Sequence, residues 1–548
     1  MIVSTLTSSA GDERGRLAAA VAASPGDAQL RRAFAAALAK GNEPRPALEQ
    51  YRTVLALVPN DPDAAANAGL MAGRCGLEEE TLPLVRAVAE ANPRHPRLWQ
   101  VLGLMHRGID ELEPAVQALD NASRLAPGDS LIAHGLARAR FEAGMSSTPY
   151  FEQAQKLAPT DKSVLIGHAA AMIAEGRPEE AEAMLQAELK RDPAWVTGHA
   201  ALARHLWSMG DKETFTASME GALRALPRHL DLWKELILIW MHAGFHETAL
   251  AVIARGRAVA GPNALFDANE AACHAELGNY EKADALFAAV AALPDPTVML
   301  RHVRHLLRTR RPDEAERIAR PTMGSPAAAN FFPYLSIAWR MMENPLFEWL
   351  EGDPRLVGIY DLGETLPSLD ALADCLRALH LSVHQPLEQS LRGGTQTDGY
   401  LFSRVEPEIR SLRHAVVDAV KAHVAQLPAH DPRHPQLGVP RAPIRFSGSW
   451  SVRLTGGGCH ANHIHPQGWF SSALYVALPA EDERGPSPAG WLTLGEPQAE
   501  RGLDLKAIRT IEPKPARLVL FPSTMWHGTV PFASGERLTV AFDVAPPL

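Results

Sequence analysis

The chain has 548 residues, of which 46% are hydrophobic and 21% charged, an ordinary balance for a soluble globular protein but a length too great for one hydrophobic core. Its formal net charge of -9 at pH 7 gives no electrostatic basis for binding nucleic acid or an anionic membrane. We therefore expect two or more domains and neither of these two partners.

Cysteine usage and the N-terminal segment bear on the cellular compartment. The first residues, MIVSTLTSSAGDERGRL, lack the basic and apolar parts of a signal peptide, and no run approaches the roughly 18 apolar residues of a membrane span. The cysteines are scattered without Cys-x-x-Cys spacing and predict neither a zinc site nor a disulfide framework: Cys75, Cys273, Cys375 and Cys459. A reducing, cytoplasmic location is the expectation.

Residues 1–320 are rich in Ala and Leu and carry a proline at a nearly constant interval. The prolines are Pro25, Pro59, Pro93, Pro127, Pro159, Pro193, Pro227, Pro262 and Pro294, separated by 34, 34, 34, 32, 34, 34, 35 and 32 residues. A fixed period near 34 is typical of solenoids built from paired helices. A generic helical bundle would not keep this phase over nine prolines.

The repeats also share an internal pattern, seen best in GRPEEAEAML, GFHETALAVI and GNYEKADALF, which begin at Gly176, Gly244 and Gly278. The glycine is expected to end the first helix of each pair, and the proline to stop the second. A small residue (Ala181, Ala249 and Ala283) lets the two helices approach closely. In this pattern the segment of about residues 15–315 resembles the tetratricopeptide repeat family, which implies a superhelix with a concave face.

The function of this arm is open at the level of sequence. Such superhelices bind peptides or proteins in their groove, and they also serve as spacers or dimerisation devices. A polar or aromatic stripe on the concave face would favour binding.

After Pro321 the period is lost and the composition changes. Helices are expected in FFPYLSIAWRMMENPLFEWLEGD, SLDALADCLRALHL and EIRSLRHAVVDAVKAHVAQL, and a polar loop in QSLRGGTQTDGYLF. From Arg445 the pattern becomes β, with RFSGSWSVRLT, WFSSALYVALP, GWLTLGE, RLVLFPS and RLTVAFDV between Gly- and Pro-rich turns, which suggests a jelly roll or small barrel. The predicted domains are the repeats at 1–320, a helical connector at 321–385 and a β domain at 386–548.

Histidines set the β region apart from a plain sandwich. His463 and His465 lie in HANHIHPQGWFS, directly before a strand, where residues two apart point to the same side. His527 follows 62 residues beyond His465, Arg537 follows ten residues after His527, and Thr539 lies two residues further. His460 is a weaker candidate, as a supporting or surface residue. This cluster predicts a metal site.

The order of these residues along the chain resembles that in the double-stranded β-helix oxygenases, and the sequences around them resemble one group of these enzymes. WSVRLTGGGCHANHIHPQGWFSSALYVALP and LVLFPSTMWHGTVPFASGERLTVAFDV are similar to the bacterial putative 2-oxoglutarate/Fe(II) oxygenase family, over about residues 330–548. Members of that family often carry N-terminal tetratricopeptide repeats. The resemblance implies an α+β multidomain protein, in which an α-solenoid precedes a double-stranded β-helix (jelly-roll) oxygenase domain.

The resemblance also implies roles for single residues. His463, His465 and His527 would hold Fe(II) at an open facial site, which leaves positions for 2-oxoglutarate and O₂. Arg537 would bind the distal carboxylate of 2-oxoglutarate, with help from Thr539 and Tyr475.

One departure from the family pattern concerns the metal ligands. The carboxylate expected in a His-x-Asp segment is missing, because the chain reads His463-Ile464-His465. Three interpretations are open: three histidines ligate the metal, two histidines and a water suffice, or the metal site is altered or inactive. The first is preferred.

The leading hypothesis is a 2-oxoglutarate-dependent dioxygenase that hydroxylates a peptide or protein side chain recruited by the repeats. Arg392, Thr395 and Gln396, in the polar loop, are candidates for lining the substrate entrance. The alternatives are an oxygenase of small molecules, a non-catalytic repeat scaffold with a degenerate β domain, and a cupin-type enzyme without 2-oxoglutarate. The last would leave Arg537 and Thr539 without a role.

Overall fold

The computed structural model describes residues 2–366, 368–387, 389–498 and 502–547. Its contacts divide the chain into two compact units. The first runs to Arg177 and takes in the short segment Phe402–Glu406, and the second holds Pro178–Leu401 and Pro407–Pro546. These units do not follow the limits predicted after residues 320 and 385, which stay predictions.

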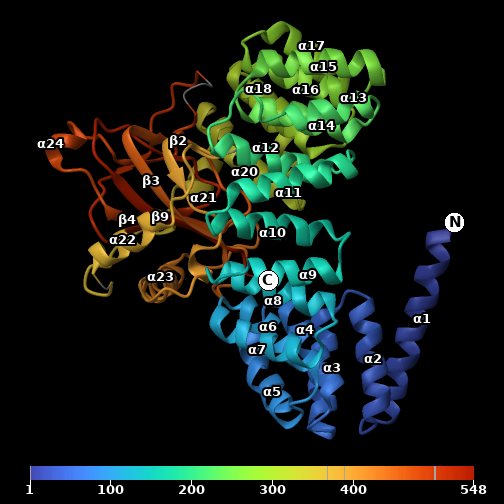
Figure 1. The fold of residues 1–548 in the computed structure, drawn as a ribbon. Coiled ribbons are helices and arrows are strands. Elements are labelled where there is room, and N and C mark those ends of the chain that lie inside the picture. Colours follow the sequence, from blue (N-terminus) through green and yellow to red (C-terminus); the bar gives the residue numbers. More distant parts are fainter. Residues whose placement is uncertain (1, 367, 388, 499–501, 548) are drawn as a thin grey trace. The chain divides into compact units, whose positions relative to one another are not determined.

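Helices that pair in sequence order make up the described chain as far as Ala319 (Figure 1). Those of the first unit are α1 (Ile2–Ala23), α2 (Ala28–Lys40), α3 (Pro44–Leu57), α4 (Pro62–Gly73), α5 (Glu78–Ala91), α6 (Pro96–Gly108), α7 (Leu112–Leu125), α8 (Ser130–Glu142), α9 (Thr148–Leu157) and α10 (Lys162–Ala174). Those of the second are α11 (Pro178–Arg191), α12 (Val196–Ser208), α13 (Ala217–Ala225), α14 (Leu230–His242), α15 (His246–Ala260), α16 (Ala264–Glu276), α17 (Tyr280–Val290), α18 (Pro296–Arg308) and α19 (Pro312–Ala319).

The 34-residue pattern explains where these helices begin and end. Asp27, Asp61, Asp129 and Asp161 each lie two residues after a repeat proline and accept backbone N–H groups at the start of a helix. The glycine between the helices of a pair adopts the left-handed conformation, as Gly176 does with φ of 75°. The small residues Ala181, Ala249 and Ala283 are fully buried. The predicted helical solenoid is therefore present.

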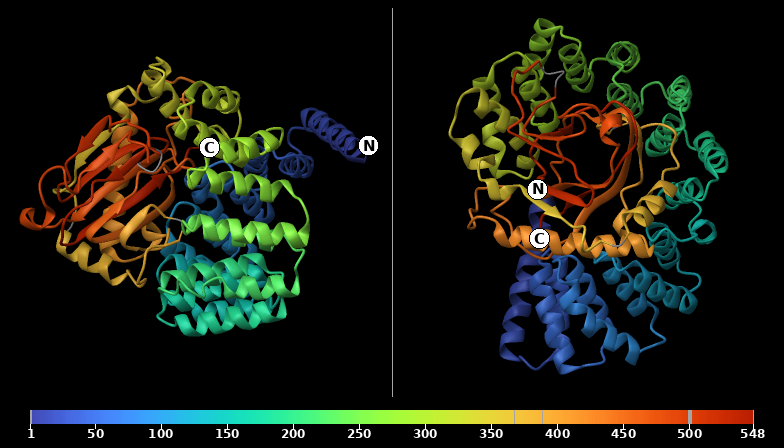
Figure 2. Two further views of the ribbon diagram at one scale, coloured as in Figure 1. Left: turned by 90° about the horizontal axis from the view of Figure 1, so that it is seen from above. Right: turned by 90° about the vertical axis from the view of Figure 1, so that its left-hand side faces the viewer.

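A second group of short helices links the repeats to the strands. They are η1 (Arg320–Gly324), α20 (Ala328–Met341), α21 (Leu346–Glu351), η2 (Pro354–Leu356), α22 (Leu369–Ala378), η3 (Leu401–Ser403), α23 (Pro407–Gln426) and α24 (Glu481–Arg484). Helix α20 carries the aromatic residues expected from Phe331 onward, and most of them are buried. Helices α22 and α23 lie beside the strands (Figure 2).

The strands form two antiparallel sheets. The larger has the order β1-β7-β4-β9-β3-β2, with β1 (Gly358–Asp361), β2 (Leu391–Gln396), β3 (Phe446–His460), β4 (Phe470–Ala477), β7 (Arg517–Pro522) and β9 (Arg537–Val544). The smaller has the order β6-β5-β8, with β5 (Leu492–Leu494), β6 (Arg509–Ile511) and β8 (His527–Thr529). An antiparallel sheet domain follows the repeats, as the alternating segments after Arg445 predict.

One segment differs from its expectation as a loop. Leu391–Gln396 forms the edge strand β2, because the long strand β3 offers it a partner. The register shifts between Arg392 and Gly394, where Gly393 has a φ of 71° that a residue with a side chain would adopt only under strain. The glycine at position 393 therefore allows the bulge in this strand.

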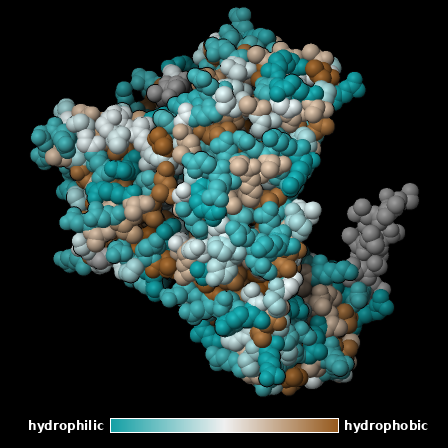
Figure 3. Space-filling model, viewed as in Figure 1, coloured by the Kyte–Doolittle hydropathy of each residue, from teal (hydrophilic) through white to brown (hydrophobic). Residues whose placement is uncertain are grey.

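On the face that Figure 3 shows, hydrophilic residues predominate and apolar ones are scattered. Within the described part of the chain, no helix combines the length and apolar character that crossing a membrane requires.

Candidate metal and cosubstrate site

Three histidines from separate parts of the β domain come together. His463, in the β3–β4 connection, exchanges backbone hydrogen bonds of 2.9 and 3.0 Å with His527 at the start of β8. The backbone N–H of His465 donates to the carbonyl of Ser523 at 2.9 Å. One ring nitrogen from each histidine lies within 4.8 Å of the other two. A cation between these nitrogens could bind all three.

Hydrogen bonds at the opposite ring nitrogen orient each of these histidines. The Nδ1 acceptors are the carbonyl of Ala461 for His463 (2.9 Å), the carbonyl of Met525 for His527 (2.9 Å) and the carboxylate of Asp543 for His465 (2.6 Å). With Nδ1–H as the donor in each case, the lone pair of Nε2 is left for the metal. This pattern of outer partners is typical of metal-bound histidine.

Asp543 is a site residue that the sequence reasoning missed. Its second carboxylate oxygen accepts a hydrogen bond of 2.6 Å from the hydroxyl of Ser471 on β4. Residues at every second position of β9 share one side of the strand, and Asp543 is therefore on the side of Arg537 and Thr539. Counting by twos along RLTVAFDV from Arg537 would have identified it.

The surroundings favour the neutral form of two histidines. Burial lowers the pKa of His463 and of His527 well below the ordinary value, and neighbouring histidines lower each further. Burial also lowers the pKa of His460, to about 3. His460 stacks on His463 with ring centroids 5.7 Å apart, but its ring is not part of the converging group. Neutral imidazoles are the form that binds a metal ion.

Arg537 is buried, and no carboxylate of the described residues pairs with it. Its side chain is 2% exposed, and its Nε has no hydrogen-bond acceptor among the described residues. The guanidinium carbon lies 5.1 Å from the ring centre of Tyr475, and burial lowers the pKa of Arg537. By contrast, Arg377 and Arg453 both pair with Glu536, the residue next to Arg537 in the chain. A buried, uncompensated guanidinium is a site for an anion.

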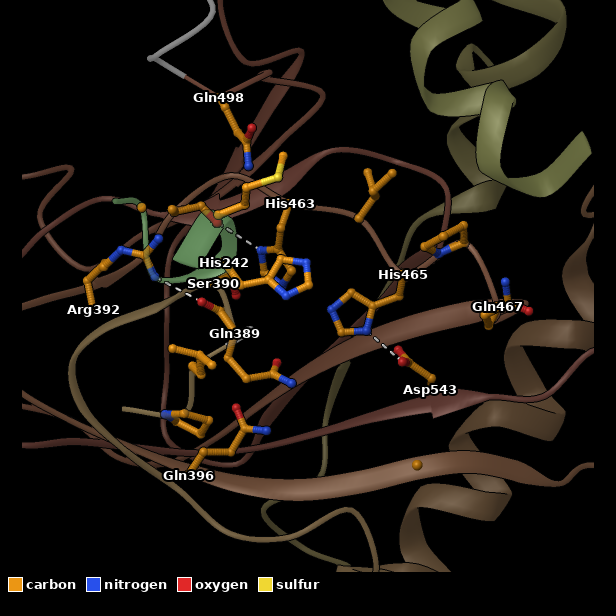
Figure 4. Close-up of a pocket in the computed structure, with 18 of the residues that line it drawn as sticks. His242, Gln389, Ser390, Arg392, Gln396, His463, His465, Gln467, Gln498 and Asp543 are labelled. Carbon is orange, nitrogen blue, oxygen red and sulfur yellow. Dashed lines mark hydrogen bonds and ion pairs between the residues drawn. The ribbon is translucent and has the colours of Figure 1, made fainter. Parts of the chain in front are cut away.

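Two cavities meet at the histidines. The inner one, of about 50 Å³, is lined by His463, His527, Arg537 and Thr539 among others. The outer one has a volume of about 1200 Å³ (Figure 4). His463, His465, Trp450 and Asp543 line both cavities, and Trp450 stacks on His465 with centroids 5.6 Å apart.

The residues predicted for the substrate entrance have different positions. Arg392 and Gln396 line the outer cavity. Thr395 does not, because its hydroxyl is turned to His380, with 2.8 Å between Oγ1 and Nδ1. Tyr475 is completely buried beside Arg537.

The repeats also contribute to the outer cavity, which no motif in the sequence predicts. Its lining from the repeats includes His242, His246, Arg301, Arg304 and Arg308. All five belong to the second compact unit, as do the histidine group and Arg537. Their convergence depends on the packing of α18 near the β domain, which no local motif records.

A family model matches part of the sheet domain. Residues 448–543 match the model of a family described as "Putative 2OG-Fe(II) oxygenase". A comparison with curated proteins finds no match.

Solved structures resemble the chain over part of its length. They include a tetratricopeptide repeat protein from Parabacteroides merdae, with 12% identity over 44% of this chain and 97% of that one and a TM-score of 0.33. Pseudomonas aeruginosa pilF shows 17% identity over 37% and 94%, with a TM-score of 0.30. MamA from Desulfovibrio magneticus shows 22% identity over 28% and 88%, with a TM-score of 0.26.

The matched segment holds the histidine group, Arg537 and Asp543. Upstream of it lie helix pairs with the spacing and internal pattern of tetratricopeptide repeats. Residues 448–543 are therefore similar to the family described as "Putative 2OG-Fe(II) oxygenase", and they follow a helical solenoid with tetratricopeptide-like spacing.

Proposed function

We propose that the β domain is a double-stranded β-helix oxygenase that uses Fe(II) and 2-oxoglutarate to hydroxylate a peptide or protein side chain. The observation that carries the proposal is the meeting of three oriented histidines with a buried, unpaired arginine at the junction of two cavities. The family match of residues 448–543 supports the same chemistry.

The residues present fit both groups. His463, His465 and His527 would hold Fe(II) through Nε2, since each Nδ1 already has an acceptor. Arg537, with Thr539 and Tyr475, would bind the distal carboxylate of 2-oxoglutarate from the inner cavity. When bound, Fe(II) and 2-oxoglutarate activate O₂ for C–H hydroxylation and yield succinate and CO₂.

Asp543 offers an explanation for the missing carboxylate of the His-x-Asp segment. Its negative charge reaches the site through the hydrogen bond to His465 and is held by Ser471. A carboxylate in this outer position raises the basicity of the histidine that it contacts. We propose three-histidine ligation on this basis, rather than two histidines with a water.

The size and lining of the outer cavity favour a macromolecular substrate over a small molecule. A volume of about 1200 Å³ exceeds the range of ordinary small-molecule pockets, about 300–1000 Å³. Its walls come from the repeats as well as from the β domain. A peptide with its reactive side chain directed at His463 and His465 would use both walls.

The test is iron content and succinate formation. Anaerobically purified protein loaded with Fe(II) should bind about one iron per chain and convert 2-oxoglutarate to succinate. His527→Ala should lose the iron and lower turnover by about 100-fold or more. His414→Ala, which removes an exposed histidine of α23, is the matched control and should behave as the wild type.

A second variant separates cosubstrate binding from metal binding. Arg537→Gln should keep the iron but raise the KM for 2-oxoglutarate about tenfold or more, because a charged hydrogen bond to the carboxylate is lost. A protein that binds no iron, or whose His527→Ala variant matches the wild type, would instead be the non-catalytic scaffold.

A further inference from the structure

The wall of the outer cavity opposite the β domain carries a row of arginines. Arg301, Arg304 and Arg308 of α18 all line this cavity. Spacings of three and four residues bring side chains to one side of a helix, and the row therefore follows the helix axis. Arg392 of β2 lines the same cavity.

Among the described residues, a single carboxylate, that of Glu276, forms ion pairs with this row. Arg308 pairs with Oε2 of Glu276, and Nη2 of Arg304 lies 3.5 Å from Oε1 of the same residue. Arg301 forms no ion pair with a described carboxylate, although Asp295 attracts it over a longer distance, and its Nη1 donates to the side-chain oxygen of Asn269 at 2.7 Å. The row therefore holds more positive charge than its surroundings neutralise.

Partial burial makes this excess costly. The Nε atoms of Arg304 and Arg308 are buried without a hydrogen-bond acceptor among the described residues. Burial lowers the pKa of Arg301, and the positive charge of Arg304 lowers it further. Two guanidinium groups in such a setting are stabilised by an anion that bonds to both.

We propose that the substrate is an acidic peptide, whose Asp or Glu carboxylate binds Arg301 and Arg304 while a nearby side chain reaches the histidine group. This inference rests on the proposed function and specifies its substrate class. The chemistry favours a single carboxylate over a polyphosphate. Glu276 and Asp398 also line the cavity, and the chain has a net charge of -9. These negative charges repel the many phosphates of a nucleic acid more strongly than a single carboxylate.

A shared hydrophobic core holds the arginine row at a fixed place relative to the histidines. Val303, Leu306 and Leu307 of α18 pack in one cluster with residues of α20 and with Trp526, the neighbour of His527. Ile464, between His463 and His465, packs against the same cluster. The acidic residue and the hydroxylated residue should therefore be separated by a constant number of residues in different substrates.

Binding of defined peptides to the full-length protein tests the proposal without requiring turnover. Three short fluorescein-labelled peptides would alternate Gly with Glu, Gln or Lys, and fluorescence anisotropy would give the affinity of each. The Glu peptide should bind about tenfold or more tightly than the other two, and salt should weaken it. Equal binding of the Glu and Gln peptides by the wild type would overturn the proposal.

Variants locate the binding on α18. Arg301→Gln with Arg304→Gln should weaken the Glu peptide by about tenfold or more, since charged hydrogen bonds are lost. Arg224→Gln with Arg228→Gln removes the same charge from exposed positions outside the cavity and should change nothing. Because Arg301 is partly buried, the single Arg304→Gln is measured too, with circular dichroism as the check on folding.

The remaining outcomes are equally decisive. Arg301→Glu with Arg304→Glu should shift the preference from the Glu to the Lys peptide. If a short oligo-dT displaces the Glu peptide more strongly than unlabelled Glu peptide does, the site binds nucleic acid and the proposal is wrong. Failure of iron binding and succinate formation would remove the proposed function but leave peptide binding measurable, so the two failures can be told apart.

Discussion

At the scale of single residues, backbone hydrogen bonds set the position of each candidate metal ligand. His463 and His465 are two residues apart, and their backbones are fixed by bonds to β8 and to Ser523. The structure brings them together with His527, and their role as ligands is our proposal. Thr395 shows the limit, because its direction depends on the tertiary contact with His380, which sequence does not record.

Asp543 gives the first prediction at this scale. Asp543→Asn keeps an oxygen that can accept from Nδ1 of His465 but removes the negative charge, so the affinity for Fe(II) should fall by about 10- to 100-fold. Titration with Fe(II) under anaerobic conditions measures it.

Ser471→Ala is the control for the Asp543 prediction. It removes one hydrogen bond to the carboxylate and leaves the charge, and it should have a smaller effect. Unchanged iron affinity in Asp543→Asn would show that the carboxylate has no part in metal binding.

At the scale of elements, strongly periodic segments could be predicted and short ones could not. The 34-residue spacing predicts the paired helices, and the amphipathic stretches place α22 and α23 close to their observed limits, whereas the stretch from Phe331 divides into α20 and α21. The strands β1, β2, β6 and β8 escaped prediction, because they are short, lack the apolar runs that indicate β5 and β7, and are defined by their partners in the sheets. The arginine row was missed for the same reason, since its place in the site depends on packing of distant elements.

A buried carboxyl in α21 makes the stability of this region depend on pH. Burial raises the pKa of Glu351 from 4.5 to about 7, against the effects of Ser336 and Arg340 on α20. Between about pH 4.5 and about pH 7, the carboxyl of Glu351 is therefore protonated in the folded chain and ionised in the unfolded chain. Its contribution to the free energy of unfolding is complete below about pH 4.5 and is lost as the pH rises through about 7. The loss amounts to about 3 kcal/mol at most.

Glu351→Gln should remove this dependence. Urea unfolding at about pH 5.5 and about pH 8.5 should show a loss of stability at the higher pH in the wild type and a smaller loss in the variant. Glu348→Gln, an exposed position on the same helix, should retain the wild-type dependence. Identical pH profiles for Glu351→Gln and the wild type would contradict the assignment.

At the scale of the whole molecule, the chain joins two compact units, and the candidate site lies in the second of them. The histidine group, both cavities and the last repeats belong to the second unit. The predicted domain limits and cytoplasmic location stay predictions from sequence. The repeats continue across the boundary after Arg177, which explains why their period alone could not reveal it.

Metal binding should therefore stabilise one unit alone. Calorimetry of the full chain should show two unfolding transitions. Mn(II) or Fe(II) should raise the midpoint temperature of only the transition that belongs to the second unit. At a metal concentration of about 100 times Kd, the free energy of unfolding of the second unit should increase by about 2.7 kcal/mol. Chelation, or His527→Ala, should abolish the shift, and a shift of both transitions would show that the units unfold together.

The core around Trp526 also bears on how such a chain can diversify. Its indole Nε1 donates to the carbonyl of Pro333 at 3.0 Å, and its neighbours include residues of α18 and α19. This junction ties the end of the repeat series to the sheet domain. Whole repeats can therefore be gained or lost near the N-terminal end, in steps of one helix pair, while the histidine group keeps its geometry. Arm length and chemistry are then free to evolve separately.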